Sequence, residues 1–536
     1  MRNIAAGMQK KVWQIRPASR DAAKLAQSLN ISPLVAQILI NRQLDQTEPA
    51  RAFLSPKLSD LIAPEQMFGI SEAAACIRQA IESRKKISIY GDYDVDGITS
   101  VAILWHLLQM LGAQVDYYIP HRIDEGYGLN SDAVRRLAAG GTELLITVDC
   151  GITAVEPVRL AREMGIQTLI TDHHQPGAVL PDAAAIVHPR LDPAYGNPHS
   201  AGAMVAFKLA WAVANAYKKG VQLSAPLRQY LLNATTLAGI GTIADVVDLR
   251  GENRVLAGYG LKALEASNLV GIRTLVQTAE LYAADVNSYA VAFRLAPMLN
   301  AAGRMGHARL AVELLTTESE VRAIQIAQYL KDQNRLRQKY QLDIFKQARQ
   351  RIVQMGLHHP DRKTIVLADE NWHTGVIGIV AARIVDDFYR PTILINTGEG
   401  IGQGSGRSIE GFNLHAHLEA CSDYLISFGG HEMAAGLRIE PSRIAAFAEA
   451  FEASAEQAFR EKMPASCLTI DAEVRIADFT ERLMKELNYL EPFGQGNPKP
   501  LFAVRGVKLI APPRKVGARS DHLQLSIADA SGAVRC

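Results

Sequence analysis

Three aspartates at alternate positions follow a short apolar run near residue 90. The run Lys86–Ile89 leads into the motif YGDYDVDG at residues 90–97, which contains Asp92, Asp94 and Asp96. A turn at the end of a strand can gather the side chains at i, i+2 and i+4 around one point. Three carboxylates held that close repel one another strongly unless a cation lies among them. The spacing therefore predicts a divalent metal site at the end of a buried strand.

Two other interpretations of this motif compete with the metal site. An EF-hand calcium loop also begins Asp-x-Asp-x-Asp-Gly, but it needs a helix before it and a glutamate at position 12, where this chain has Ile103. A charged surface turn needs no metal, but it does not explain why an apolar strand should end in three carboxylates. The metal site is the favoured interpretation.

Carboxylates and imidazoles recur after later apolar runs. Glu143–Val148 ends in Asp149-Cys150-Gly151, Thr168–Thr171 ends in Asp172-His173-His174, and a longer helical stretch leads to the motif GTIAD at 241–245. In open parallel α/β sheets, ligands bind at the carboxyl ends of the strands. A single Asp after a strand is often only a helix N-cap. Here four segments end in metal-binding types of side chain, Asp245 included, and together they predict one shared site.

The order of apolar segments predicts an α/β fold with several domains. At 536 residues the chain is too long for one ordinary core, and its 48% hydrophobic and 21% charged residues are typical of a soluble globular protein. We expect a parallel-sheet lobe with Ile98–Leu111 as its first crossover helix, a long helix over Glu318–Met355, and a second α/β lobe. The expected boundaries are 1–85 (helical lead-in), 86–317 (first lobe), 318–360 (connecting helix), 361–462 (second lobe) and 463–536 (a β-rich segment).

The second lobe carries glycine-rich motifs beside polar residues. Strands are expected at Thr364–Leu367 and Thr392–Ile395, and the motif HTGVIG at 373–378 opens a helix. The motif GSGRS at 404–408 is expected to be a flexible polar loop, and Gly429-Gly430-His431 to begin a turn. Such motifs are commonly mere turns, but small residues at a helix start also let the backbone approach a phosphate.

Cysteine usage and charge narrow the class of protein. The five cysteines form no CxxC pair, as expected in a reducing cytoplasm, and no apolar run is long enough for a membrane helix or a secretory signal. Net charge is only +2, yet residues 331–351 hold seven basic against two acidic residues, and residues 499–519 hold six basic and none acidic. Either stretch alone can be a solvated face; together they favour a polyanionic partner.

In this order the motifs resemble the DHH phosphoesterase family, named for its Asp-His-His triplet, and within it the RecJ branch of single-stranded-DNA exonucleases. The resemblance runs through most of the chain. Its eight motifs are Gly91–Gly97, Thr147–Gly151, Thr171–His174, Gly241–Val246, Pro297–Arg304, His373–Ala382, Gly404–Ser408 and Gly429–Gly436.

The resemblance implies roles for individual residues. The expected ligands of one or two Mn²⁺ or Mg²⁺ ions are Asp94, Asp96, Asp149, His173 and Asp245, with Asp149 as the bridging carboxylate. Asp92 and His174 match flanking catalytic positions, although His174 could instead be a buried structural histidine, and His431 matches a histidine near the scissile phosphate. The expected substrate-binding residues are Arg122, Arg304, His373, Ser405, Arg407, Ser408, Gly429 and Gly430. Three residues of this set match positions that bind a 5′-phosphate: Arg122, Ser405 and Arg407. Arg304 matches a position near the substrate entrance, and its alternative role is a buried arginine that pairs with an acidic residue.

The implied function is metal-dependent 5′-to-3′ hydrolysis of single-stranded DNA to mononucleotides, in DNA repair and recombination. The implied protein is a monomer, with a single-strand-binding protein and a helicase as further candidate partners. Two alternatives are a DHH phosphodiesterase of short RNA oligonucleotides or cyclic dinucleotides, whose relatives are usually much shorter, and a non-catalytic replication scaffold, whose relatives have lost metal ligands. The C-terminal segment matches the position of an OB-fold domain, with strands expected at Leu468–Ile476, Leu501–Ile510 and His522–Ala528. A further strand is expected at Val534, close to the last residue, so we expect an incomplete barrel.

Overall fold

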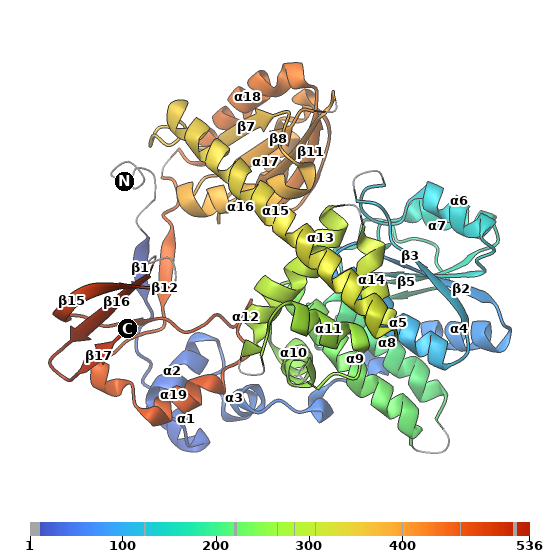
Figure 1. Cartoon of the computed structure of the whole chain (residues 1–536), viewed down its shortest axis with the longest axis horizontal. Coiled ribbons are helices and arrows are strands. Elements are labelled where there is room, and N and C mark those ends of the chain that lie inside the picture. The colour runs from blue at the N-terminus through green and yellow to red at the C-terminus, as the bar shows by residue number, and fades with distance from the viewer. Residues whose placement is uncertain are drawn as a thin grey trace. The chain divides into compact units, whose positions relative to one another are not determined.

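The computed structural model describes residues 11–122, 125–218, 222–264, 266–282, 285–305, 307–398, 400–460, 462–517 and 522–536. The chain forms two compact units. The smaller unit contains Asp332–Thr469, and the larger unit contains Ile15–Lys331 together with Ile470–Cys536. Figure 1 shows their helices and strands. Among the described residues, no helix is both long and apolar enough to span a membrane.

The larger unit is built on a five-stranded parallel sheet with the order β3-β2-β4-β5-β6. Its strands are β2 (Lys86–Gly91), β3 (Gln114–Tyr118), β4 (Leu144–Val148), β5 (Gln167–Thr171) and β6 (Ala185–Val187). Gly91 pairs with Val148, and Val148 with Thr171, so three neighbouring strands end at one level. The chain steps from β2 outward to β3 and then returns to β4 on the other side of β2. This reversal is a topological switch point, where α/β sheets bind their ligands.

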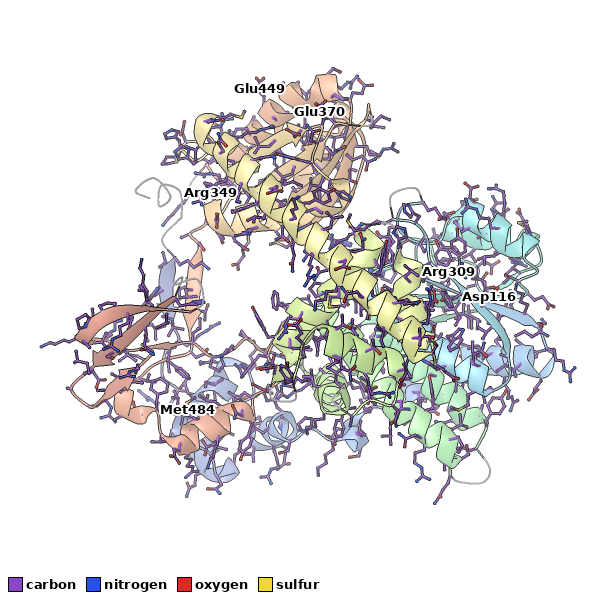
Figure 2. The ribbon with its side chains drawn as sticks, viewed as in Figure 1. Asp116, Arg309, Arg349, Glu370, Glu449 and Met484 are labelled. Carbon is purple, nitrogen blue, oxygen red and sulfur yellow. The ribbon has the colours of Figure 1, made fainter. Side chains whose placement is uncertain are left out.

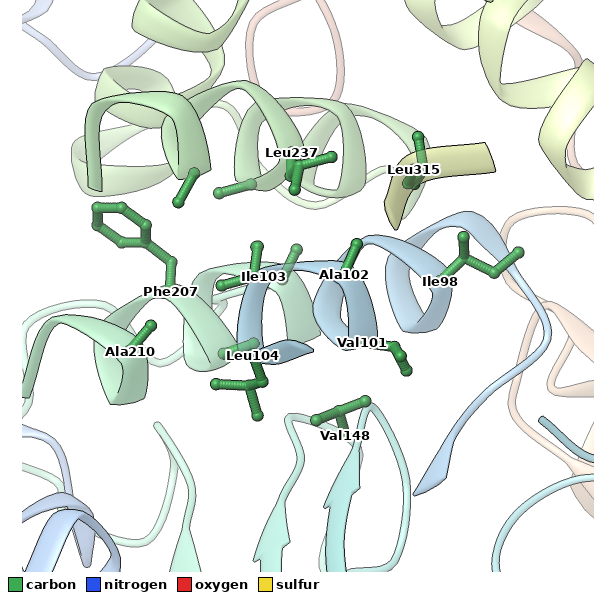
Figure 3. Packing of buried hydrophobic residues seen from close by; sticks show 14 of the residues in the cluster. Ile98, Val101, Ala102, Ile103, Leu104, Val148, Phe207, Ala210, Leu237 and Leu315 are labelled. Atoms are coloured by element: carbon green, nitrogen blue, oxygen red, sulfur yellow. The ribbon is translucent and has the colours of Figure 1, made fainter. Parts of the chain in front are cut away.

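Helices cover both faces of this sheet. The helix α5 (Val95–Met110) packs against α8 (Gly202–Ala216) and α9 (Ala225–Ala244). Figure 3 shows Val101 and Leu104 of α5 on the side of the sheet, near Val148, and Ile103 toward Leu237 of α9. The helix is apolar all round because it is enclosed by the sheet and by other helices. It begins three residues earlier than expected, since the Asp94 carboxylate accepts hydrogen bonds from the backbone N–H groups of Asp96 and Gly97.

The other helices of the larger unit complete this core. They are α4 (Ile70–Glu82), α6 (Ser131–Ala139), α7 (Val155–Glu163), α10 (Gly251–Leu264), α11 (Val270–Thr278), α12 (Ser288–Ala290), α13 (Ala296–Arg304) and α14 (Ala308–Thr316). A π-helical turn, η4 (Val291–Leu295), joins α12 to α13. The long helix α15 (Glu320–Gln354) matches the predicted connecting helix within two residues at each end, and it contributes Leu330 to the core of the larger unit and Ile344 to that of the smaller.

The smaller unit contains a mixed five-stranded sheet with the order β10-β11-β9-β8-β7. Its elements are β7 (Ile365–Asp369), α16 (Thr374–Phe388), β8 (Thr392–Asn396), β9 (Gly402–Arg407), α17 (Leu414–Ala420), β10 (Leu425–Gly430), β11 (Ala434–Ile439) and α18 (Ile444–Ala458). Only β7 and β8 run parallel; each other neighbouring pair is antiparallel.

The prediction of a flexible loop at 404–408 was wrong, because most of this segment belongs to β9, the central strand of the sheet. Its glycines serve packing. A Cβ on Gly404 would lie 2.7 Å from a methyl of Leu437, and one on Gly406 would lie 2.9 Å from a methyl of Leu414. The expected turn at Gly429 was likewise misplaced, since Gly429 and Gly430 are the last residues of β10.

The C-terminal segment is β-rich, as expected, but its first part is built into the N-terminal helices. Those helices are α1 (Ala22–Leu29), α2 (Pro33–Asn41) and α3 (Thr47–Leu54), preceded by β1 (Val12–Ile15), which pairs with β12 (Cys467–Ile470). Leu483 and Leu490, from α19 (Glu481–Asn488) and the turn after it, share one core with Val35 and Phe53.

The predicted C-terminal strands were too long in two places. The run 468–476 is divided into β12 and β13 (Ala472–Glu473), and the run 501–510 into β14 (Phe502–Ala503) and the start of β15 (Lys508–Val516). The last three strands, β15, β16 (His522–Ala528) and β17 (Ala533–Arg535), form an antiparallel sheet. The strand predicted at His522–Ala528 is therefore confirmed, and the strand expected at Val534 is β17.

Candidate metal centre

Seven of the predicted residues converge at the switch point of the larger unit. Three overlapping groups each place one ligand atom per residue within 4.8 Å of the others. These groups are Asp149, His173 and His174; Asp96, His173 and Asp245; and Asp92, Asp94 and Asp149. Asp149 and His173 each belong to two groups, so the cluster is continuous.

Asp96 is held by the start of α8. Its carboxylate accepts hydrogen bonds from the backbone N–H groups of Gly202, at 2.5 Å, and Ala203, at 2.8 Å. Free N–H groups at a helix start favour a negative charge. A Cβ on Gly202 would lie 2.8 Å from Oδ1 of Asp149 and 2.9 Å from Oδ2 of Asp96, so glycine is required there. Sequence reasoning missed Gly202, because no local pattern reveals a contact 106 residues from Asp96.

Asp149 has an unusual backbone conformation. Its φ is 60°, in the left-handed region that non-glycine residues rarely adopt and that is common at functional sites. Its backbone N–H donates to the carbonyl of Thr171 at 3.0 Å, which continues the β4–β5 ladder by one residue. The side chain is thereby fixed, fully buried, among the carboxylates of the cluster.

Asp245 follows a helix and not a strand, which corrects the prediction of four strand ends. It is the C-cap of α9, and its backbone N–H donates to the carbonyl of Gly241. A Cβ on Gly241 would lie 2.8 Å from Oδ1 of Asp96, so the glycine lets α9 approach the cluster.

Several polar atoms of the cluster face one another without hydrogen bonds. Nε2 of His173 lies 3.1 Å from Oδ1 of Asp149, 3.6 Å from Oδ2 of Asp245 and 3.8 Å from Oδ2 of Asp96. Within the described residues, four of these buried atoms lack a partner of acceptable geometry: Asp92 Oδ1, Asp149 Oδ1, His173 Nε2 and Asp245 Oδ2. A buried polar atom left unpaired costs about 1–3 kcal/mol. Four of them around one point fit a bound cation.

The electrostatics agree with this arrangement. Burial, reinforced by the neighbouring carboxylates, raises the pKa of Asp149 well above its usual range, that of Asp96 to about 7 and that of Asp245 to about 9. Burial and the charge of His174 lower the pKa of His173 to about 3. His173 is therefore neutral and suited to be a ligand, whereas the carboxylates need a compensating positive charge to ionise together.

His174 belongs to a hydrogen-bonded group beside the cluster. Its Nδ1 lies 2.7 Å from Oδ1 of Asp172, and this contact raises the pKa of His174 although burial alone would lower it. Asp172 also accepts hydrogen bonds from the backbone N–H groups of Ile152, His173 and His174. Burial alone would raise the pKa of Asp172, but the hydrogen bond with the His174 ring, the charge of that ring and the backbone N–H groups lower it to about 2. The Tyr127 hydroxyl lies 3.2 Å from Nε2 of His174. Sequence reasoning did not identify Tyr127, which is in a loop without a motif.

Two of the predicted substrate-binding residues, Arg122 and Arg304, belong to segments that lie near Tyr93 in the larger unit. The Arg122 guanidinium is 4.9 Å from the centre of the Tyr93 ring. Arg304 ends α13, where a Cβ on the preceding Gly303 would lie 2.6 Å from the Tyr93 carbonyl oxygen. Burial and the charge of Asp94 raise the pKa of Asp92 well above its usual range, and the charge of Arg122 opposes this rise only weakly. Both arginines are thus near the first aspartates of the cluster.

The other predicted residues belong to the smaller unit. Arg407 donates to the Ser405 hydroxyl at 3.2 Å, and a Cβ on Gly378 of α16 would lie 2.7 Å from that hydroxyl and 3.0 Å from the Arg407 guanidinium. His373 caps α16 by accepting the N–H of Gly375, and its ring stacks on Tyr340. These contacts bring α16 and β9 together around Ser405 and Arg407.

The remaining predicted site residues of the smaller unit differ in their exposure to solvent. Ser408 is buried, and its hydroxyl donates to the carbonyl of Phe412 at 2.6 Å. His431 and Gly429 are exposed, and Gly430 has a φ of 140° that favours glycine.

The two basic stretches differ in what their charges contact. In the first, Lys331 pairs with Glu280, Arg349 with Asp387 and Arg351 with Asp369, so much of its charge is used within the protein. Figure 2 shows Arg349 on α15. In the second, Arg505 pairs with Glu473, whereas β15, which carries Lys508, Arg514 and Lys515, is exposed throughout. Arg519 lies outside the described residues.

Comparisons with known proteins decide the family. The DHH family N-terminal domain matches residues 86–237, the DHHA1 domain matches residues 361–457, and the RecJ OB domain matches residues 470–536. The RecJ single-stranded-DNA-specific exonuclease of Haemophilus influenzae is 32% identical over 95% of this chain and 89% of its own length. The chain belongs to the RecJ family.

Other RecJ proteins support the assignment. The Bacillus subtilis RecJ is 41% identical over 98% of this chain, which spans 65% of the length of that relative. The crystal structure of Thermus thermophilus RecJ in complex with Mn²⁺ matches with a TM-score of 0.83 and 31% identity, over 98% of this chain and 73% of that one. The DHH match contains the parallel sheet of the larger unit, and the DHHA1 match contains the sheet of the smaller unit.

Proposed function

We propose that this chain is a metal-dependent exonuclease that hydrolyses single-stranded DNA from its 5′ end to mononucleotides, in DNA repair and recombination. The observation that carries the proposal is the continuous cluster around Asp149, with four buried polar atoms that lack hydrogen bonds among the described residues. Membership of the RecJ family supports the substrate and the direction. A non-catalytic scaffold is disfavoured, because every predicted ligand is present.

We assign the metal ligands to Asp94, Asp96, Asp149, His173 and Asp245, with Asp149 shared between two ions. Four carboxylates and one imidazole suit Mn²⁺ or Mg²⁺ better than thiolate-seeking metals. When bound, the ions would supply a water activated for attack and positive charge that stabilises the leaving oxygen of the phosphodiester. The helix start at Gly202 and Ala203 holds the Asp96 carboxylate in place for this task.

The chain's own residues position the substrate and a proton. Asp172 holds His174 through Nδ1, and the Tyr127 hydroxyl lies 3.2 Å from the other ring nitrogen, Nε2. We assign this side of the His174 ring to hydrogen-bond a phosphate oxygen, which would replace or join the tyrosine hydroxyl. Asp92, buried among the carboxylates, supports the ligands. His431 is assigned to contact near the scissile phosphate.

We assign the grip on the 5′-phosphate to Arg122, Ser405 and Arg407. Arginine suits this role through its bidentate fork, and the Ser405 hydroxyl lies within hydrogen-bonding distance of Arg407. We place Arg304 at the substrate entrance. His373, Gly429 and Gly430 are assigned to substrate contact, and Ser408 to holding the turn after β9, since its hydroxyl donates to Phe412.

We further propose a monomer that acts in the cytoplasm, with a single-strand-binding protein and a helicase as partners. Five cysteines without a disulfide support the compartment. The partners rest on the family alone.

Digestion of single-stranded DNA labelled at either end tests the function. With Mn²⁺, we expect a 5′ label to be released at once as a mononucleotide, while a 3′-labelled strand shortens progressively. A chelator should abolish both. Release of the 3′ label first, or hydrolysis that persists in the chelator, would contradict the proposal.

A further inference from the structure

Tyr93 lies between two residues of the metal centre, on the turn that joins β2 to α5. Asp92 and Asp94, on either side of it, belong to one of the metal-binding groups. A tyrosine offers no carboxylate to such a group, yet its large ring is partly buried in this position. The ring therefore needs an explanation other than metal binding.

The backbone around Tyr93 is held in place by α13. Gly303 packs against it so closely that a Cβ on this glycine would lie 2.6 Å from the Tyr93 carbonyl oxygen and 3.6 Å from the Tyr93 Cβ. Asn300, about one helical turn earlier, accepts the backbone N–H of Val95 through its side-chain oxygen at 3.2 Å. Because α13 contacts the turn at two points, the Tyr93 ring projects from a fixed backbone.

The Arg122 guanidinium lies over the Tyr93 ring, with its central carbon 4.9 Å from the ring centre. A guanidinium within about 6 Å of a tyrosine ring is attracted by the negative face of that ring. Among the described residues, the Arg122 side chain forms no hydrogen bond and no ion pair. The ring face is therefore the contact that directs this side chain.

The backbone next to Arg122 is anchored separately. The Glu125 carboxylate accepts the backbone N–H of His121 at 3.0 Å and the Tyr118 hydroxyl at 2.7 Å. These bonds fix where the Arg122 side chain begins. They do not set its direction, since a long arginine side chain has many rotamers. The Tyr93 ring selects among them.

An aromatic ring can hold an arginine without using its hydrogen-bond donors. A carboxylate partner would occupy the N–H groups of the guanidinium fork and offset its charge. A ring face attracts the cation as a whole, so the N–H donors remain for a phosphate. Arg122 is also the residue of the proposed 5′-phosphate site that belongs to the larger unit, as the metal ligands do.

We propose that Tyr93 is a positioning residue that directs Arg122 toward the 5′-phosphate of the strand. This inference rests on the proposed function and deepens it, since it names the residue that orients one arginine of the 5′-phosphate site. Because Tyr93 is on the same turn as Asp92 and Asp94, it also ties that arginine to the metal centre. The end of the strand is thereby held at a fixed place relative to the metal ligands.

The test compares the full chain with its Tyr93→Leu variant, on single strands that carry either a 5′-phosphate or a 5′-hydroxyl, at saturating Mn²⁺. Leucine keeps apolar bulk but removes the ring, so KM for the 5′-phosphorylated strand should rise about three- to thirty-fold with little change in kcat. KM for the 5′-hydroxyl strand should stay within about two-fold of the wild type. Tyr93→Phe keeps the ring and should keep the wild-type preference.

The matched control is Tyr259→Leu in α10, which removes a ring that lies 5.4 Å from the Lys262 ammonium and should leave both KM values within about two-fold of the wild type. A double variant tests whether Tyr93 acts through Arg122. In an Arg122→Ala background, Tyr93→Leu should cause no further rise in KM for the 5′-phosphorylated strand, because the group that the ring positions is gone.

A graded series keeps the test decisive if leucine disturbs the fold. In Tyr93→Phe, fluorine atoms added one by one leave the size of the ring nearly unchanged but weaken its negative face, so KM for the 5′-phosphorylated strand should rise with each fluorine.

Three results would overturn the role of Tyr93: equal losses on both strands, a further loss in the Arg122→Ala background, or fluorinated rings that leave KM unaltered. A wild type that hydrolyses both strands equally well would overturn the proposed 5′-phosphate site together with this role. A wild type that hydrolyses neither strand would overturn the proposed function itself.

Discussion

Asp149 lies where two of the metal-binding groups meet, and its Oδ1 has no hydrogen-bond partner among the described residues. Asp149→Asn keeps the shape of the side chain but removes the charge that would be shared by two ions. We expect hydrolysis to fall by about 10³-fold or more at saturating Mn²⁺, measured as nucleotide release. The fold should remain intact, and the unfolding temperature of the metal-free protein should not fall, because burial already favours the neutral form of the Asp149 carboxyl when no metal is bound.

The control for this substitution is Asp182→Asn, which breaks an exposed ion pair with Arg162 and should leave hydrolysis unchanged. Substantial activity of Asp149→Asn in excess Mn²⁺ would refute the shared-ligand assignment.

Arg407 tests the grip on the 5′ end. Arg407→Ala removes a charge-assisted contact, so KM for 5′-phosphorylated strands should rise about 10–100-fold, with a much smaller change for 5′-hydroxyl strands. Arg438→Ala, on the neighbouring strand β11, removes an exposed arginine from the same sheet and serves as the control. An equal loss on both substrates would count against a 5′-phosphate site.

The raised pKa values predict how metal-free stability depends on pH. The pKa of Asp96 is raised to about 7 and that of Asp245 to about 9, from an ordinary value of 3.8. A carboxyl group whose folded-state pKa is raised favours the folded state at low pH, and this stability is lost as pH rises through the folded-state pKa. In chelator, the unfolding temperature should therefore fall by several degrees between about pH 6 and about pH 9.

Mg²⁺ should reverse this trend, because its binding displaces protons from the carboxylates and so becomes stronger as pH rises. In Asp245→Asn, the fall of the unfolding temperature in chelator should be shallower. A fall as steep as in the wild type would mean that the titration lies elsewhere in the protein.

At the scale of single residues, the sequence predicted the metal-binding side chains better than the residues that hold them in place. Asp92, Asp94 and Asp96 could be found because their spacing is local. Gly202, Tyr127 and the acceptor role of Asp172 could not be found from spacing, since each depends on contacts between distant segments or on a loop without a motif.

At the scale of elements, the order of apolar segments predicted both the parallel sheet and the long helix α15. Glycine was the source of the main error. In β9 it was taken as a sign of flexibility, whereas Gly404 and Gly406 make room for Leu437 and Leu414. A glycine that lets another side chain pack cannot be distinguished from a loop glycine without the tertiary fold.

Helix α8 provides a prediction at this scale. Gly202→Ala would place a Cβ 2.8 Å from Oδ1 of Asp149 and push α8 away from Asp96. We expect hydrolysis to fall at least about ten-fold, because displaced ligands no longer fit the ions, while the helix itself persists. Metal affinity, followed as the rise of the unfolding temperature with added Mn²⁺, should fall in parallel.

The control for this change is Gly258→Ala in α10, where the nearest atom to the new Cβ is 4.0 Å away. Alanine there should stabilise the helix by about 0.5–1 kcal/mol and leave activity unchanged. Wild-type activity and metal affinity in Gly202→Ala would show that the close approach of α8 is dispensable.

At the scale of the whole molecule, the C-terminal segment has two parts with different roles. Residues 470–503 are bound into the larger unit, since Leu483 and Leu490 share a core with the N-terminal helices and Arg254 holds the turn at 489–492. Deletion of everything from residue 467 would therefore damage the fold. Removal of 507–536 takes away only the sheet β15-β16-β17, whose first strand is exposed throughout.

This shorter deletion tests whether that sheet binds DNA. Its basic residues Lys508, Arg514 and Lys515 would contact backbone phosphates, and such contacts weaken steeply with added salt. The deletion should raise KM for long strands and flatten the salt dependence of that KM, while turnover of very short oligonucleotides changes little because they reach only the metal centre. The variant Lys508→Gln/Arg514→Gln/Lys515→Gln keeps the sheet and should reproduce both effects. If long-strand KM and its salt dependence are unaltered in both proteins, the sheet does not bind DNA and its charges only keep an exposed surface solvated.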